Sequence, residues 1–323
     1  MFLQGLFLFF ILMGIIMIFS SKSWLMIWVG LELTMFSFIP LLGEKSQQVE
    51  GAMKYFLAQT MGSLMLIMST PFLFMESAVF YFLMLALIFK VGAPPLHFWY
   101  IDIMYSLNWK QLWFLFTIQK IGPLLSLFYL LESKMNNLFM GFIILSMFTG
   151  SMGGLNQKYI KILLGYSSIS HTGWALASMI FGYYMFILYF IMYSFILTSL
   201  MLIIYYLNLP KSIFHMEWWS LKDSLLFFMN LLSLGGMPPF LGFFMKWMVI
   251  ESLYKADFYF MSMYFIFMAL LTMFYYINLF IYTTMNNIII SKLFDKMKNK
   301  MLFKEVLIMT SLNFLPLLFF MFL

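Results

Sequence analysis

Four charged side chains lie within stretches that are otherwise apolar enough to cross a membrane: Glu32, Lys90, Lys120 and Lys246. At a rise of 1.5 Å per helical residue, Lys120 lies roughly 16 Å from either end of its apolar stretch and Glu32 roughly 12 to 15 Å. A charge at that depth costs about 2.5 to 3.5 kcal/mol. All 18 cationic residues are lysine, and a buried lysine, unlike an arginine, can gain and release a proton. The four side chains therefore predict proton handling inside a membrane.

Each of these residues also has a structural explanation. Glu32 and Lys120 could be members of a static ion pair inside a helix bundle. Lys90 lies two residues before Gly92, where its helix is expected to end, so its ammonium could reach the membrane surface along its own apolar stem. Lys246 follows an interrupted stretch, and the same explanation applies to it.

Two of the apolar stretches are interrupted by similar sequences, Gly92-Ala93-Pro94-Pro95 and Gly236-Met237-Pro238-Pro239. Consecutive prolines end a helix and leave carbonyl groups without partners, which is tolerated at membrane depth only beside protein or water. A lysine precedes the first interruption, and another follows the second. Interrupted helices at matching positions of two repeats indicate a transport path.

Two further stretches carry polar groups at membrane depth. Pro123 follows Lys120 by three residues and is expected to bend the helix beside it. The segment 166–173 carries Tyr166, Ser168 and His171 among other hydroxyl groups. Such a stripe could hold a chain of water molecules, and hydrogen bonding between helices is the alternative, at least equally well supported for the serines.

The composition excludes several classes of protein. The chain of 323 residues is 64% hydrophobic and 9% charged, whereas soluble domains average about 25% charged residues, so it is not a water-soluble globule. The absence of cysteine excludes disulfides, Cys-ligated zinc and Cys-ligated iron–sulfur clusters in this chain. Three scattered histidines give no metal-ligand spacing. The many Met and Phe residues and the lack of Arg suit an AT-rich genome that reads extra codons as Met, as in animal mitochondria, or an AT-rich bacterium.

Apolar runs long enough for spanning helices predict an all-α, polytopic membrane protein with about 11 transmembrane helices. The predicted runs are 2–20, 24–42, 54–75, 77–92, 109–131, 137–155, 160–180, 182–207, 224–250, 258–284 and 306–323. The first ten form two five-helix repeats, 1–131 and 137–284, and an odd number of helices inverts the second repeat. The segment 286–305 has apolar residues at helical spacing and indicates an amphipathic helix in the interface, with a solvated lysine-rich loop as the alternative.

The lysines are distributed unequally between the two sets of loops. Twelve fall in the loops of one side: Lys45, Lys54, Lys110, Lys158, Lys161, Lys211, Lys222, Lys292, Lys296, Lys298, Lys300 and Lys304. Three fall on the other side: Lys22, Lys134 and Lys255. Positively charged loops stay on the side of synthesis, so the N-terminus is expected in the matrix or cytoplasm and the C-terminus, after run 306–323, opposite. The net charge of +6 is thereby explained without a nucleic-acid partner.

Seven stretches, in the order in which the family has them, resemble the chain 2 family of respiratory NADH:ubiquinone oxidoreductase (complex I). This family consists of mitochondrially encoded, antiporter-like membrane subunits, and the resemblance is to its animal, invertebrate form. The stretches are WVGLELTMFSFIPLL at 28–42, EGAMKYFLAQ at 50–59, FKVGAPPLHFW at 89–99, IQKIGP at 118–123, GSMGGLNQ at 150–157, LLGYSSISHTGW at 163–174 and LSLGGMPPFLGFFMKW at 232–247. The ends of the chain and run 258–284 match only in hydropathy.

The resemblance implies the antiporter-like fold, and it implies that Glu32, Lys90, Lys120 and Lys246 are the proton-transfer residues. In this relay Glu32 is expected to pair with Lys90, whose proton then moves by way of Lys120 to Lys246. His97, Asp102, His171, Ser168 and Tyr166 are expected to have supporting roles. Two departures concern the first interruption and the last lysine: Ile101 and Asp102 replace a proline and a glutamate, and Met245 replaces a proline. The first departure makes a functional role for Asp102 less secure than the roles of Glu32 and the three lysines.

The resemblance further implies a proton-pumping subunit in the mitochondrial inner membrane, with its N-terminus in the matrix and its C-terminus in the intermembrane space. No cofactor is expected in this chain, and FMN, iron–sulfur clusters and ubiquinone belong to partner subunits. The expected partners are other membrane-arm subunits of complex I, including further antiporter-like subunits, and lipids. The alternatives are a free-standing cation/proton antiporter and a structural scaffold of the membrane arm.

Overall fold

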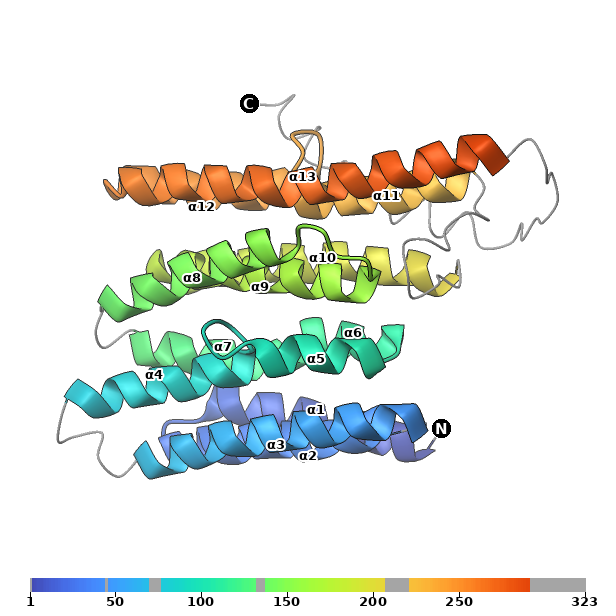
Figure 1. Ribbon diagram of the computed structural model, residues 1–323. Coiled ribbons are helices and arrows are strands. Elements are labelled where there is room, and N and C mark those ends of the chain that lie inside the picture. The colour runs from blue at the N-terminus through green and yellow to red at the C-terminus, as the bar shows by residue number, and fades with distance from the viewer. Residues whose placement is uncertain (1, 44–45, 70–76, 132–136, 207–220, 291–323) are drawn as a thin grey trace. The chain divides into compact units, whose positions relative to one another are not determined.

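The computed structural model describes residues 2–43, 46–69, 77–131, 137–206 and 221–290, and in these residues helices are formed and no strands (Figure 1). The chain divides into two compact units, unit 1 (Met1–Ser146) and unit 2 (Met147–Leu323). An all-helical architecture suits a bilayer, because a helix satisfies its backbone hydrogen bonds internally. The predicted all-α class is confirmed for the described part of the chain.

The described residues of unit 1 form seven helices and the start of an eighth. They are α1 (Phe2–Ser20), α2 (Trp24–Leu42), α3 (Ser46–Ser69), α4 (Ser77–Val91), α5 (Phe98–Ser106), α6 (Trp109–Phe116) and α7 (Ile118–Leu131), and α8 (Asn137–Gly153) runs across the division. Helices α1 and α2 approach closely at two glycines. A Cβ atom on Gly14 would lie 2.8 Å from the carbonyl oxygen of Gly30, and one on Gly30 would lie 2.9 Å from that of Gly14. Small residues allow this close contact, as is usual between membrane helices.

Unit 2 is built around α9, which lies at its centre. Its helices are the end of α8, then α9 (Ile160–Ile180), α10 (Tyr183–Tyr206), α11 (Leu221–Gly235), α12 (Leu241–Lys255) and α13 (Tyr259–Ile290). Nearly all of α9 is buried, including its serines and its histidine. Gly150 of α8 packs directly on the backbone of Ser170, leaving no room for a side chain. A helix buried all round can carry polar groups only where they find partners, so α9 is a candidate functional element.

The two predicted interruptions are confirmed, and they share one conformation. The N–H of Gly92 donates to the carbonyl of Phe89 and that of Ala93 to Ile88, while Gly236 and Met237 make the same pair of bonds to Ser233 and Leu232. Gly92 has φ +78° and Gly236 has φ +89°. This is a Schellman helix end, which requires a left-handed residue and therefore favours glycine. The chain then turns through the two prolines and begins a new helix, α5 or α12.

The run 109–131 differs from the prediction of one helix bent at Pro123. The helix is interrupted at Thr117, between α6 and α7, and Pro123 lies inside α7. The hydroxyl of Thr117 donates to the carbonyl of Trp113 over 2.7 Å, and the N–H of Lys120 bonds back to Thr117 instead of Phe116. A threonine hydroxyl that competes for helix carbonyls bends or ends the helix. Lys120 therefore lies in the first turn of a new helix.

Four helical stretches in the described residues are long and apolar enough to cross a membrane: Trp24–Leu42, Trp109–Leu131, Tyr183–Tyr205 and Tyr259–Ile281. They are fewer than the eleven predicted runs, partly because the interruptions leave α4, α11 and α12 with 15 residues each. The run 306–323 lies outside the described residues. So does most of the predicted interfacial segment 286–305, into which α13 extends as far as Ile290.

Candidate functional site

Lys90 and Glu32 form an ion pair inside unit 1. The Nζ atom of Lys90, in the last turn of α4, lies 3.5 Å from Oε1 of Glu32 in the middle of α2. The side chains are 1% and 12% exposed, respectively. The stem of Lys90 passes over Gly62 of α3, where a Cβ atom would lie 2.7 Å from its Cγ. Three helices therefore position the ammonium, and the glycine on α3 makes the space for it.

The helix end beside this pair is stabilised by an amide. Helix α4 ends at Val91, and the N–H groups of Gly92 and Ala93 bond to carbonyls earlier in its last turn than that of Lys90. The side chain of Gln59 on α3 donates from Nε2 to the carbonyl of Lys90 over 3.1 Å. Gln59 is buried, and its bond holds the interrupted helix against α3 at the position of the lysine.

Lys120 lies deep in unit 1, at 2% exposure. Its Nζ atom is 5.0 Å from the ring centroid of Tyr100 on α5. The neighbouring Gln119 accepts a hydrogen bond from the hydroxyl of Tyr55 over 3.2 Å. An ammonium within about 6 Å of an aromatic ring is attracted by the negative face of the ring. The interaction offsets part of the cost of burying Lys120.

Lys246 lies in unit 2, beside the second interruption. It lies in α12 at 4% exposure, and its Nζ atom donates to the carbonyl of Gly235, the last residue of α11, over 2.7 Å. The ring centroid of Trp174 on α9 is 5.8 Å from the same atom. The C-terminal end of a helix carries partial negative charge, which stabilises a cation. The interruption itself thus supplies a site for this lysine.

The three lysines share a chemical arrangement. Each is almost fully buried, and each has a group nearby that stabilises its charged form: a carboxylate, an aromatic ring or a helix terminus. A buried ammonium with such limited compensation can exist in both charged and neutral forms, unlike a guanidinium. The arrangement can hold positive charge and release it as a proton.

His97 and Asp102 lie on either side of the start of α5. His97 is buried and precedes the helix, with its Nδ1 atom 3.3 Å from the carbonyl of Pro95 and its ring stacked on Phe98. Asp102 is exposed. The structure therefore places His97 in the turn that follows the interruption, and it leaves Asp102 on the exposed side of α5.

His171 lies among aromatic side chains in unit 2. Its Nδ1 atom is 2.7 Å from the hydroxyl of Tyr189, and its ring centroid is 4.7 Å from that of Tyr193. Sequence reasoning missed both tyrosines, which lie four residues apart on one face of α10. Their spacing of four residues places both on one face of a helix and could have indicated a shared contact. However, α10 is mainly apolar and contains several other tyrosines, so the sequence did not single these two out.

Four hydroxyl groups of α9 donate hydrogen bonds within their own helix. Ser167, Ser168, Ser170 and Thr172 each donate to the carbonyl three residues earlier in their own helix. Tyr166 packs its ring against Gly153 of α8. These four bonds lie within α9, and both interpretations of the stripe, a chain of water molecules and hydrogen bonding between helices, stay predictions.

Lys161 is a buried lysine that the sequence analysis assigned to a loop. It lies in the first turn of α9 and is 4% exposed, so counting it among the loop lysines was wrong. The error has a simple cause: a residue one position inside a helix start can face either the core or the solvent. Only the packing of unit 2 decides this.

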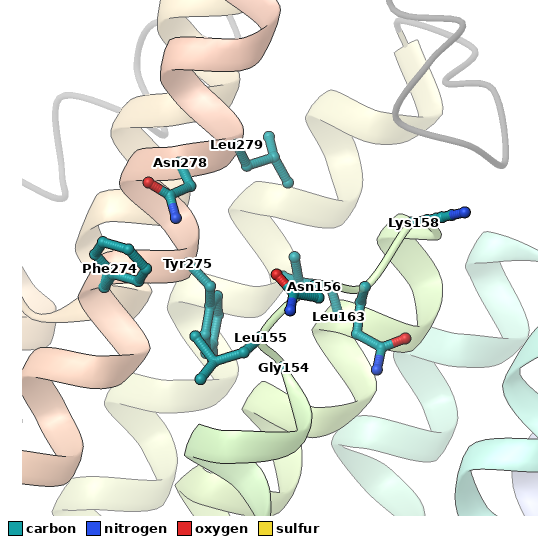
Figure 2. A pocket seen from close by; sticks show the side chains of 10 residues that line it. Gly154, Leu155, Asn156, Lys158, Leu163, Phe274, Tyr275, Asn278 and Leu279 are labelled. Carbon is teal, nitrogen blue, oxygen red and sulfur yellow. The ribbon is translucent and has the colours of Figure 1, made fainter.

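A pocket of about 450 Å³ opens beside this end of α9 (Figure 2). It is lined by the turn between α8 and α9 and by α13, through Gly154, Leu155, Asn156, Gln157, Lys158, Leu163, Phe274, Tyr275, Asn278 and Leu279. Tyr275 packs on Gly154, where a Cβ atom would lie 2.7 Å from its ring. Two amide side chains and a lysine, Asn156, Gln157 and Lys158, are the polar residues of the turn that lines it. In the described residues, no cluster of His, Asp and Glu could hold a metal ion.

Comparisons with known proteins place the chain in a family. The model of the family described as NADH:quinone oxidoreductase/Mrp antiporter, TM, matches residues 21–272. The chain is 38% identical over 293 residues to NADH-ubiquinone oxidoreductase chain 2 of Anopheles gambiae, covering 85% of this chain and 84% of the relative. It is 36% identical over 256 residues to the chain 2 protein of Lumbricus terrestris, covering 76% of each.

Solved structures show the same fold at low sequence identity. A chain of respiratory complex I from Thermus thermophilus has a TM-score of 0.80 at 19% identity, covering 98% of this chain and 79% of that chain. A chain of the Mrp complex from Dietzia sp. has a TM-score of 0.77 at 14% identity, covering 84% of this chain and 59% of that chain. The chain belongs to the NADH:quinone oxidoreductase/Mrp antiporter membrane family and, within it, to the chain 2 group of NADH-ubiquinone oxidoreductases.

Proposed function

We propose that this chain is a proton-translocating membrane subunit of respiratory complex I. The observation that carries the proposal is the buried pair of Lys90 and Glu32 at an interrupted helix, in a chain that belongs to this family. NADH oxidation and ubiquinone reduction take place in partner subunits, where FMN and the iron–sulfur clusters lie. This chain supplies proton transfer, coupled to that chemistry through neighbouring antiporter-like subunits of the membrane arm.

The pair acts as an electrostatic switch. Two unit charges about 4 Å apart interact by about 4 kcal/mol at an effective dielectric constant near 20. That energy changes the ratio of charged to neutral lysine by about three powers of ten. When a neighbouring subunit draws Glu32 away, Lys90 loses its stabilising carboxylate and passes its proton on. Lys120 and Lys246 are the next carriers in this relay.

The supporting residues hold the carriers in place and extend the relay. His97 orders the turn after the first interruption, and Asp102 has at most a role at the exposed surface of α5. His171 of α9 and Tyr189 of α10 form a hydrogen-bonded pair that can exchange a proton, and Tyr166 and Ser168 of α9 have supporting roles. The excess of lysine in one set of loops supports an N-terminus in the matrix and a C-terminus in the intermembrane space of the mitochondrial inner membrane.

The substitution Lys120→Met tests the relay in the assembled complex, reconstituted into liposomes. Methionine keeps the length of the side chain and removes the proton carrier, so the number of protons pumped per electron should fall. The matched control is Lys255→Met, because Lys255 is exposed and pairs with the exposed Glu251 of the same helix. An unchanged proton-to-electron stoichiometry in Lys120→Met would overturn the proposal.

A free-standing cation/proton antiporter is the second candidate, favoured by the fold shared with the Mrp complex chain. The two functions differ in what the isolated chain does. Purified alone and placed in liposomes, an antiporter would exchange sodium or potassium for protons across an imposed gradient. A complex I subunit would be inactive in that assay and active only after assembly.

A further inference from the structure

One side chain of unit 1 connects the helix interruption with Lys120. A Cβ atom on Gly92 would lie 2.8 Å from the ring of Tyr100, so the ring rests directly on the left-handed glycine. The centroid of the same ring lies 5.0 Å from Nζ of Lys120. Tyr100 is almost completely buried. It therefore fills the space between the interruption after α4 and the lysine of α7.

Neighbouring rings fix the plane of Tyr100. Trp99 lies edge-on to it, with centroids 5.7 Å apart and an interplanar angle of 80°. Phe116, at the end of α6, packs at 6.3 Å and 52°. Both contacts limit rotation of the tyrosine ring. A displacement of the backbone at Gly92 would accordingly move the ring, and with it the electron-rich face next to the ammonium.

At the second interruption, the left-handed glycine contacts a buried lysine without an intervening ring. A Cβ atom on Gly236 would lie 2.9 Å from Cδ of Lys246, so this glycine contacts its lysine directly. Lys246 also faces an aromatic ring, that of Trp174. In each unit, the left-handed glycine of the interruption therefore sets the space available to a buried lysine or to the ring beside it.

From this geometry we propose that Tyr100 is a positioning residue for proton transfer: it stabilises the ammonium of Lys120 and transmits movement of the interruption beside Lys90 to it. The inference rests on the proposed function, because it assumes that Lys120 carries protons. The aromatic face stabilises the charged lysine while the ring remains seated on Gly92. When the interruption shifts, the ring leaves its place and the charged form of Lys120 becomes less stable.

The test compares Tyr100→Met with Tyr100→Phe in the assembled complex in liposomes. Phenylalanine keeps the ring and should retain most of the pumping, whereas methionine removes it and should reduce proton-coupled turnover about threefold to thirtyfold. Rates are normalised to the amount of assembled complex. Phe139→Met is the matched control, because Phe139 is a buried aromatic residue of α8, outside the three helices α4, α5 and α7 that carry Lys90, Tyr100 and Lys120. Equal pumping in Tyr100→Met and Tyr100→Phe would refute the inference.

The substitution Gly92→Ala tests the connection without altering Tyr100 or Lys120. The added methyl group must displace the ring, so we expect a defect like that of Tyr100→Met, and the double variant should be no worse than either single one. If the pumping defects of the two single variants multiply in the double variant, the connection is contradicted. This comparison also holds if Tyr100→Met assembles poorly, because rates are normalised to the amount of assembled complex. If Lys120→Met pumps normally, the proposed function fails. If Lys120→Met loses pumping while Tyr100→Met and Gly92→Ala pump normally, the proposed function stands and this inference fails.

Discussion

Glu32 and Lys90 are 58 residues apart in the sequence and belong to different helices, yet their charged atoms lie 3.5 Å apart. The sequence identified each residue, because a charge in an apolar stretch is unusual at any depth. The relay inferred from the family resemblance paired the two, and the structure brings them together. It could not show that Lys120 and Lys246 lie beside aromatic rings. It also could not show that Lys161 faces the core. Side-chain surroundings depend on which helices pack together, and apolar helices differ little in sequence.

At the residue scale, the buried pair predicts an asymmetry between single and double substitutions. Removing one partner leaves an uncompensated buried charge, which typically costs about 3 to 5 kcal/mol. Glu32→Gln alone or Lys90→Met alone should therefore lower the amount of assembled complex more than the two substitutions together. Native gel electrophoresis of membrane extracts measures this.

The same variants distinguish a proton carrier from a scaffold. If the pair only holds the membrane arm together, the double variant should assemble and pump normally. We expect it to assemble and to have lost pumping, measured as protons per electron in liposomes. Normal pumping in the double variant would favour the scaffold alternative.

At the scale of the elements, the helix ends carry the most information. The Gly-X-Pro-Pro pattern predicted both interruptions, because glycine accepts a left-handed backbone and proline cannot continue a helix. The break at Thr117 was not predicted, because threonine is common inside helices and its effect depends on where its hydroxyl bonds. The short helix α5 that positions Tyr100 was likewise not among the predicted runs.

The interruption in unit 2 gives a prediction at this scale. In Gly236→Ala, an alanine must adopt φ near +89°, and its methyl group would contact the stem of Lys246. Strain at such a position is of order 1 to 3 kcal/mol. We expect reduced pumping with near-normal assembly, measured as protons per electron against native gel intensity. The control is Gly141→Ala, because a Cβ atom at Gly141 meets nothing within 4 Å. A similar loss of pumping in both variants would contradict the role of the interruption in positioning Lys246.

At the scale of the whole molecule, the distribution of lysines predicts an orientation. The chain contains no cysteine, so single cysteines can be introduced and labelled with a membrane-impermeant maleimide. A cysteine in place of Lys158, which is exposed in the turn between α8 and α9, should react only in inside-out inner-membrane vesicles. A cysteine in place of Lys22 should react only in mitoplasts. Labelling of both from one side would contradict the predicted topology.

The sequence by itself determined that the chain is a helical membrane protein, that two helices are interrupted, and which charges lie at membrane depth. Hydropathy, proline and glycine act locally, so these features can be recognised within a few residues. The tertiary structure decided what each charge contacts: Glu32 for Lys90, the ring of Tyr100 for Lys120 and the end of α11 for Lys246. Those contacts join helices distant in the sequence, and close packing at glycines sets them.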